Sequence, residues 1–225
     1  MPCDDGIDTL EDAKLIAARL KASLPSSVDA RLQGVMYQSI FYALVAREAL
    51  LHRVVALADD AFFLFDAQRA LSAAIVTRSI LETMAVLGYL HDVFEKFDAS
   101  GDEKTLYSRV AKVVVGARNM PDESPLAVHV LDAIRQTERR MVVPGLMSVY
   151  ESLCEFTHPN WSGLLGFFGE HENAYRVVLG GPPRAVPPVD IHLAIVLSTF
   201  EALYDPLGDL IQHASEGLDR QRAGA

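Results

Sequence analysis

The sequence has very little cysteine, and this shortage excludes one class of protein. Cys3 and Cys154 are the two cysteines among 225 residues, and they stand far apart in the chain. A small domain that depends on disulfides needs several closely spaced cysteines. The sequence therefore predicts a chain without a disulfide framework, folded in a reducing compartment.

Positive charge is also scarce, which limits the partners that the surface can attract. The chain has 20 Lys plus Arg against 30 Asp plus Glu, a formal net charge of −10. A protein that grips nucleic acid broadly needs a basic surface. The composition therefore excludes a broad DNA-binding face, although a small local basic pocket stays compatible with it.

Long apolar runs and familiar catalytic motifs are absent as well. A membrane-spanning helix needs about 20 consecutive apolar residues, and the most apolar stretch, 73–90, is interrupted by Arg78 and Glu82. The opening MPCDDGIDTLEDAK lacks the apolar core of a signal peptide. Gly-x-Ser-x-Gly, Cys-x-x-Cys and a Gly-rich phosphate loop do not occur. We expect a soluble cytoplasmic protein with no membrane partner, and the sequence assigns it no catalytic residue and no cofactor.

What the sequence does have is apolar periodicity at helical spacing. Half of its residues are hydrophobic, enough for one sizeable core, so we expect a single domain over residues 1–225. The predicted helices cover 8–24, 30–59, 66–97, 103–118, 125–140, 144–158 and 189–216. Asp59-Asp60 is expected to end the second of these, with 61–65 (AFFLF) as a connector. The fold class is therefore an all-α bundle of six or seven helices, with 66–97 as its central helix.

The pattern changes after His158. Gly163, Gly166 and Gly169 precede an alternating Tyr-Arg-Val-Val-Leu stretch, which predicts a small β-hairpin over about 164–179. The Pro/Gly-rich residues 180–188 cannot be helical, and the tail from 217 is expected to fray. Residues 30–59 and 66–97 are apolar on nearly all sides, so we expect a homo-oligomer, most simply a helix-mediated homodimer.

Two polar groups interrupt this apolar background and form a candidate binding site. Arg78 and Glu82 lie one turn apart on the central helix, and Tyr89 extends the same stripe. Arg-Glu pairs among apolar residues are either buried ion pairs that hold helices together or part of a ligand pocket. The second group is His158, Asn160 and Trp161, in the run His-Pro-Asn-Trp where a helix stops. A histidine at a helix C-terminus is a cap or a proton carrier.

Metal binding is an alternative for the second group. Glu155-x-x-His158 has the spacing that ferritin-like bundles use, with Glu82, Glu48 or His52 as further ligands. The second Glu-x-x-His that a di-metal site needs is absent, so the preferred reading has no metal. Arg47 and His52 match a loose Arg-x4-His pattern, but residues five apart on a regular helix point about 140° away from each other.

Two segments that contain these residues resemble a known group of proteins. The segments RSILETMAVLGYL (78–90) and YESLCEFTHPNWSGLLGFFG (150–169) resemble a group of bacterial helical proteins that look like distant relatives of HEPN (higher eukaryotes and prokaryotes nucleotide-binding) proteins. The resemblance covers 33 residues of the chain and implies an all-helical fold with Arg78, Glu82, His158 and Asn160 near one another. It supplies no activity, and this chain has no HEPN ribonuclease motif in a suitable position.

Three functions follow as hypotheses. The first is a HEPN-like module that binds a nucleotide, an RNA end or a partner protein through the pocket of Arg78, Glu82, Tyr89, His158, Asn160 and Trp161. The second is an interaction protein without a small-molecule site, in which those residues only hold helices together. The third is a metal-dependent enzyme that uses Glu155 and His158.

Overall fold

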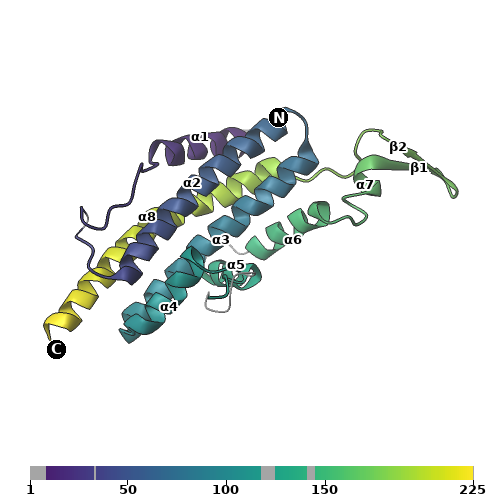
Figure 1. Cartoon of the computed structure of the whole chain (residues 1–225). Coiled ribbons are helices and arrows are strands. Elements are labelled where there is room, and N and C mark those ends of the chain that lie inside the picture. Colours follow the sequence, from purple (N-terminus) through teal and green to yellow (C-terminus); the bar gives the residue numbers. More distant parts are fainter. Residues whose placement is uncertain (1–8, 33, 118–124, 141–144, 225) are drawn as a thin grey trace, which may run out of the picture.

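The computed structural model describes residues 9–32, 34–117, 125–140 and 145–224. Within them the chain forms eight helices and one two-stranded sheet. The elements are α1 (Thr9–Ala22), α2 (Gln38–Asp66), α3 (Ala70–Ser100), α4 (Glu103–Val114), α5 (Val130–Arg140), α6 (Leu146–Thr157), α7 (Leu165–Phe168), β1 (Gly169–Asn173), β2 (Arg176–Leu179) and α8 (Val189–Ala223). The predicted all-α bundle with a hairpin in the C-terminal third is confirmed (Figure 1).

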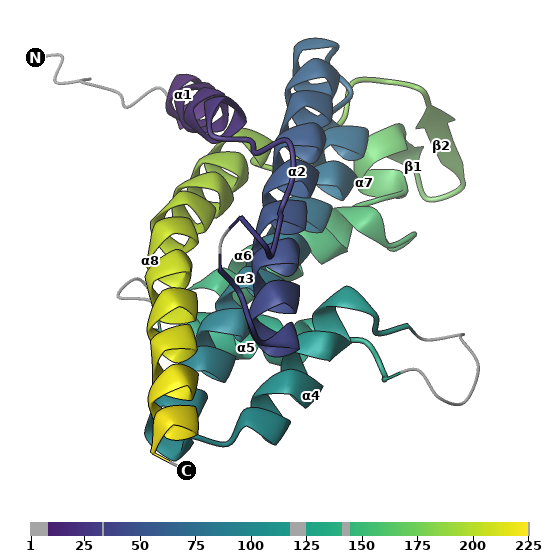
Figure 2. The ribbon, with the colours of Figure 1, turned by 60° about the vertical axis from the view of Figure 1, so that its left-hand side comes forward.

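Helix α3 is the central element, as its pattern predicts. It packs against α2, α8, α5, α6 and α4, and α1 lies across α2 and α8 (Figures 1 and 2). The buried apolar residues of the seven longer helices join in one core cluster. Among the described residues α3 alone is long and apolar enough to cross a membrane, but half of its most apolar stretch is buried by other helices. Burial of this kind is expected of the central helix of a bundle.

Helix α2 starts and ends later than its sequence pattern indicates. Its first expected residues form turns instead, where the Asp29 carboxylate accepts the backbone N–H of Arg31 at 2.8 Å and Gly34 takes φ 65°. At the other end the helix continues through Asp59-Asp60 to Asp66, so 61–65 is helical and not a connector. The two aspartates are exposed, and one of them pairs with Lys21 of α1 at 2.7 Å. Carboxylates on the solvent side of a helix interior cost little, and they do not end a helix whose other face is buried.

Helix α8 is longer than predicted. It runs to Ala223, whereas the sequence pattern predicts an end at 216 followed by a frayed tail. Leu218 is buried, Tyr37 donates a hydrogen bond to Asp219 at 3.0 Å, and Gln221 donates to the Gly101 carbonyl at 3.3 Å. The last turns therefore dock onto the end of α3 and the segment before α2. Of the expected shorter helices, α4, α5 and α6 are present, while residues 118 and 144 lie outside the described residues.

The hairpin is also placed differently. Residues 165–168, expected in its first strand, form the one-turn helix α7, and the polar sequence Gly169–Asn173 is the strand instead. The Gly166 N–H donates to the Trp161 carbonyl at 2.7 Å, which winds this segment into a helical turn. The Asn173 side chain accepts the Tyr175 N–H at 2.9 Å and closes a two-residue turn. Because of this Asn173–Tyr175 hydrogen bond, the hairpin turn lies later in the chain than the spacing of Gly163, Gly166 and Gly169 predicts.

Candidate functional site

Arg78 of α3 is the centre of the strongest polar cluster near the predicted site. Its Nε donates to Glu82 at 3.1 Å, Nη1 to the Thr157 hydroxyl at 2.9 Å, and Nη2 to the Tyr150 hydroxyl at 3.0 Å. The guanidinium carbon also lies 5.1 Å from the centre of the Tyr150 ring. One arginine therefore joins α3 to two places on α6, Tyr150 in its first half and Thr157 at its C-terminal end.

The electrostatics keep this guanidinium charged. Burial lowers the pKa of Arg78, but Cys154, Tyr150 and Glu82 together raise it above its ordinary value. Burial raises the pKa of the Tyr150 phenol, against the hydrogen bond from Arg78, so the phenol keeps its proton. The Arg78 side chain is 24% exposed. A charged donor with each of its three nitrogens bound to a protein oxygen is well suited to anchoring a helix.

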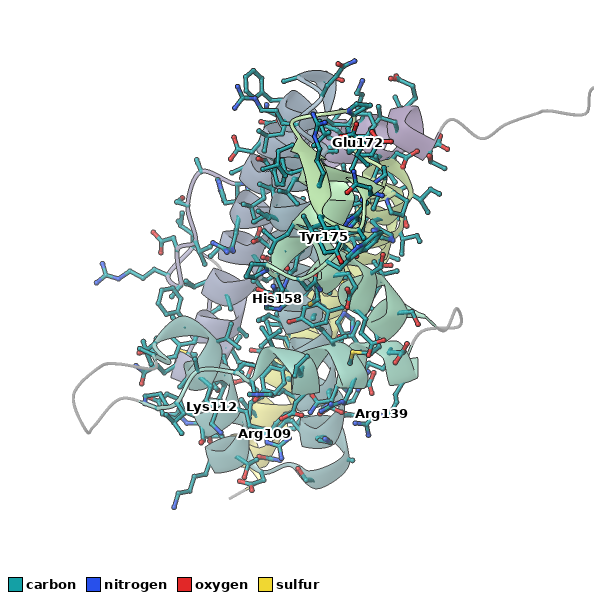
Figure 3. All side chains as sticks on the ribbon, turned by 90° about the vertical axis from the view of Figure 1, so that its right-hand side faces the viewer. Arg109, Lys112, Arg139, His158, Glu172 and Tyr175 are labelled. Carbon is teal, nitrogen blue, oxygen red and sulfur yellow. The ribbon has the colours of Figure 1, made fainter. Side chains whose placement is uncertain are left out.

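The His158 segment begins directly after this cluster but turns outward. His158 is the residue after α6, with extended backbone (φ −91°, ψ 147°), and its side chain is exposed (Figure 3). The residue before a proline is pushed out of the helical region, which explains the turn. Asn160 donates to Glu155 at 2.8 Å and accepts the Gly163 N–H at 3.2 Å, so it shapes the turn. Trp161 is 58% exposed.

The structure thus brings together only part of the predicted site. Arg78 and Glu82 meet the Thr157 end of the second segment, as expected. His158 and Trp161 are exposed and do not lie inside the helical packing, and a binding role for these two residues stays a prediction. Tyr89 belongs elsewhere, because its hydroxyl reaches the Arg109 carbonyl of α4 at 3.5 Å. Two hydroxyls that the sequence analysis did not select, those of Tyr150 and Thr157, complete the cluster.

The metal alternative finds no support in the described residues. No group of three or more His, Cys, Asp or Glu side chains is placed there to hold a metal ion. The Glu155 carboxylate is bound to Asn160, and His52 contacts the Pro25 carbonyl through Nε2 at 2.8 Å. Glu155 and His52 are therefore engaged at different places.

A second polar cluster, which the sequence did not indicate, joins α2 to α8. Arg47 contacts Glu48 and donates to the Tyr204 carbonyl at 3.0 Å, and its guanidinium lies 3.7 Å from the centre of the Tyr204 ring. The Tyr204 hydroxyl donates to Glu48, and burial raises the pKa of this phenol. Pro206 follows inside α8, where it has no backbone N–H to donate to the preceding turn. The adjacent Leu203 carbonyl accepts Nε2–H of His91 from α3 at 2.7 Å.

Many of the exposed large apolar side chains lie on the segment that follows α6, residues 161–186, here called the arm. It contains α7, β1, β2 and the loop toward α8, and it projects from the end of the bundle (Figure 1). Tyr175 at its tip is fully exposed, and Leu179 is 70% exposed (Figure 3). Other exposed apolar side chains of the arm are Trp161, Leu164, Phe168 and Val186. Surfaces of this kind mark interaction sites on soluble proteins.

Comparison of the chain with protein-family models, with curated proteins and with solved structures gives no match. The HEPN-like resemblance therefore stays a prediction. A nucleotide or RNA ligand for the Arg78 cluster stays a prediction as well.

Proposed function

We propose that the protein is an interaction module that docks another protein surface through the arm. The observation that carries the proposal is the exposure of the arm's apolar side chains, from Trp161 at its base to Tyr175 at its tip. Burying such side chains against a partner gains about 25 cal/mol for each Å² of apolar surface removed from water. Aromatic residues are also the type enriched where partners bind most strongly.

The Arg78 cluster supports this proposal as the anchor of the arm. Helix α6 leads directly into the arm, and Arg78 holds α6 on α3 through the hydroxyls of Tyr150 and Thr157. The neighbouring Glu82 opposes a phosphate at the same place, as does the net charge of −10. The cluster therefore fits the role of positioning a docking segment better than that of a nucleotide site.

Site-specific photo-crosslinking tests the proposal in cells that produce the protein. A photoreactive phenylalanine analogue replaces Tyr175 in one variant and Leu15 of α1, which is 60% exposed, in the control. We expect a discrete protein adduct at position 175, identified by mass spectrometry, and none at position 15. Equal labelling at both positions, or no protein adduct at 175, would overturn the proposal.

A further inference from the structure

The two outer edges of the hairpin differ in a way that selects one of them for pairing. The edge of β1 carries Glu170 and Glu172, and its register shifts between His171 and Asn173. Charged side chains and bulges are devices by which proteins block a sheet edge. Strand β2, by contrast, is Arg-Val-Val-Leu with every residue exposed and with regular pairing through Val177–Leu179. Only the β2 edge is open to a further strand.

The register identifies the free backbone groups on that edge. Leu179 is paired with Gly169, and the next pair outward bonds through Gly180 N–H to the Phe168 carbonyl at 2.9 Å. Hydrogen-bonded and non-hydrogen-bonded pairs alternate along an antiparallel ladder. Val178 therefore bonds inward to β1, while Val177 and Leu179 direct their N–H and C=O groups outward. Within the described part of the chain, no hydrogen bond uses these outward groups.

We propose that β2 pairs antiparallel with β2 of a second copy of this chain, with Val178 on the twofold axis. This inference rests on the proposed function and names its partner. Val177 then lies opposite Leu179 of the second copy, and the reverse pair forms by symmetry. The outward groups of these two residues make four backbone hydrogen bonds, and β1-β2 becomes half of a continuous four-stranded sheet.

The side chains are complementary to their own copies in this register. A twofold axis perpendicular to the sheet keeps like faces together, so Val177 and Leu179 of both copies form one apolar cluster. Val178 meets Val178 of the second copy on the opposite face. The same operation on β1, whose outward backbone groups belong to Gly169 and His171, would set Glu170 against Glu170 of the second copy, and like charges directly opposite each other repel. The described chain has no third strand of its own to cover β2.

An isolated two-stranded hairpin is only marginally stable in water, and further strands stabilise it. The hairpin packs chiefly on itself and on α7. A second hairpin paired at the β2 edge supplies the further strands that the isolated hairpin lacks. The arm thereby changes from an exposed ribbon into the middle of a shared sheet.

A disulfide test follows from the register, in the full-length protein. At a non-hydrogen-bonded pair the Cα atoms lie about 4.5 Å apart, within the range that a disulfide spans. We expect Val178→Cys to give a disulfide-linked dimer after mild oxidation with copper–phenanthroline, reversed by dithiothreitol. In Val177→Cys the two sulfur-bearing residues would be about 8 Å apart across the pair, so that variant should stay at the wild-type background set by the native cysteines.

Sedimentation analysis across a micromolar dilution series supplies the second measurement. We expect a reversible wild-type dimer whose dissociation constant rises at least about tenfold in Leu179→Lys, since a lysine pair at the edge opposes strand pairing. Leu15→Lys, an equally drastic change at an exposed leucine, should leave the dimer unchanged. A monomer at every concentration, or a dimer indifferent to Leu179→Lys, overturns the inference. If position 175 nevertheless captures a different protein, the proposed function stands and only the second copy as its partner is wrong.

Discussion

Arg78 joins α3 and α6, which are far apart in the sequence. The loss of its side chain should therefore weaken the packing of these two helices on each other. In Arg78→Met the Tyr150 and Thr157 hydroxyls and the Glu82 carboxylate all lose a charged donor. We expect a loss of about 1–3 kcal/mol in the free energy of unfolding, measured by urea denaturation. The control Arg135→Met removes an exposed pair with Asp132 and should cost less than about 0.5 kcal/mol. Equal losses in the two variants would contradict the anchoring role.

His91 makes the stability of the fold depend on pH. Burial lowers its pKa, helped by Arg140 and opposed by the Leu203 carbonyl and Glu95. The unfolded chain, with a histidine pKa of about 6.5, binds a proton more readily than the folded chain below that pH. Stability is therefore fully present above pH 6.5 and is lost as the pH falls through the lower folded pKa.

The substitution His91→Gln tests this dependence. A glutamine amide can still donate to the Leu203 carbonyl, but it does not titrate. We expect the fall in melting temperature between pH 7.5 and pH 5.5 to be smaller in His91→Gln than in the wild type, followed by circular dichroism. His192, whose pKa burial also lowers, should account for part of the remaining slope. An unchanged slope would show that His91 does not titrate as the structure indicates.

At the scale of residues, the sequence predicts contacts between side chains that are close together in the chain. Arg78 and Glu82 are four residues apart on one helix, so their pairing follows from spacing alone. Tyr150 and Thr157 lie seven residues apart on α6 and share a face, a signal that could have placed both beside Arg78. The direction of His158 depends on the backbone before Pro159, and spacing does not reveal whether that turn leads inward or to solvent.

At the scale of elements, α3 and α5 approach each other closely at Gly88. A Cβ added there would lie 2.0 Å from the Thr137 hydroxyl oxygen. Alanine ordinarily favours a helix over glycine by about 1 kcal/mol, yet here the clash should dominate. We expect Gly88→Ala to destabilise by about 1–3 kcal/mol and Gly88→Ala with Thr137→Ala to recover part of the loss.

The control for this prediction is Gly217→Ala in α8. An added Cβ there meets its nearest atom at 3.8 Å, an ordinary contact. We expect this variant to be as stable as the wild type or up to about 1 kcal/mol more stable. The melting temperatures of the three variants, measured side by side, test this prediction. A Gly88→Ala variant more stable than the wild type would mean that α5 lies further from α3 than the structure shows.

Helix existence follows from the sequence far better than helix ends do. Apolar periodicity alone places the seven longer helices, because each buries a stripe against its neighbours. The ends depend on contacts made elsewhere. Asp59-Asp60 is a stop signal that tertiary packing overrides, and α8 continues past 216 because Tyr37 and Gly101 bind its last turns.

At the scale of the whole molecule, the hairpin of the arm should be separable from the bundle. Residues 170–179 are all exposed, and Gly169 lies opposite Leu179. Replacing 170–178 by Gly-Gly therefore closes the chain with a two-residue turn. At concentrations below dimer formation we expect the free energy of unfolding to change by less than about 1 kcal/mol, measured by urea denaturation. A larger loss would mean that the hairpin contributes to the stability of the bundle.

The Arg47 cluster has a consequence for how the long helices are aligned. Apolar side chains of α2 and α8 would still find partners if α8 slid by one turn, about 5.4 Å. The guanidinium of Arg47 would not, since after such a slide it would meet neither the Tyr204 ring nor the Tyr204 carbonyl. The partly buried Arg47 thus favours one alignment of α8 on α2 over alternatives that differ by a turn and keep apolar contacts. This alignment also determines where along the bundle the arm begins.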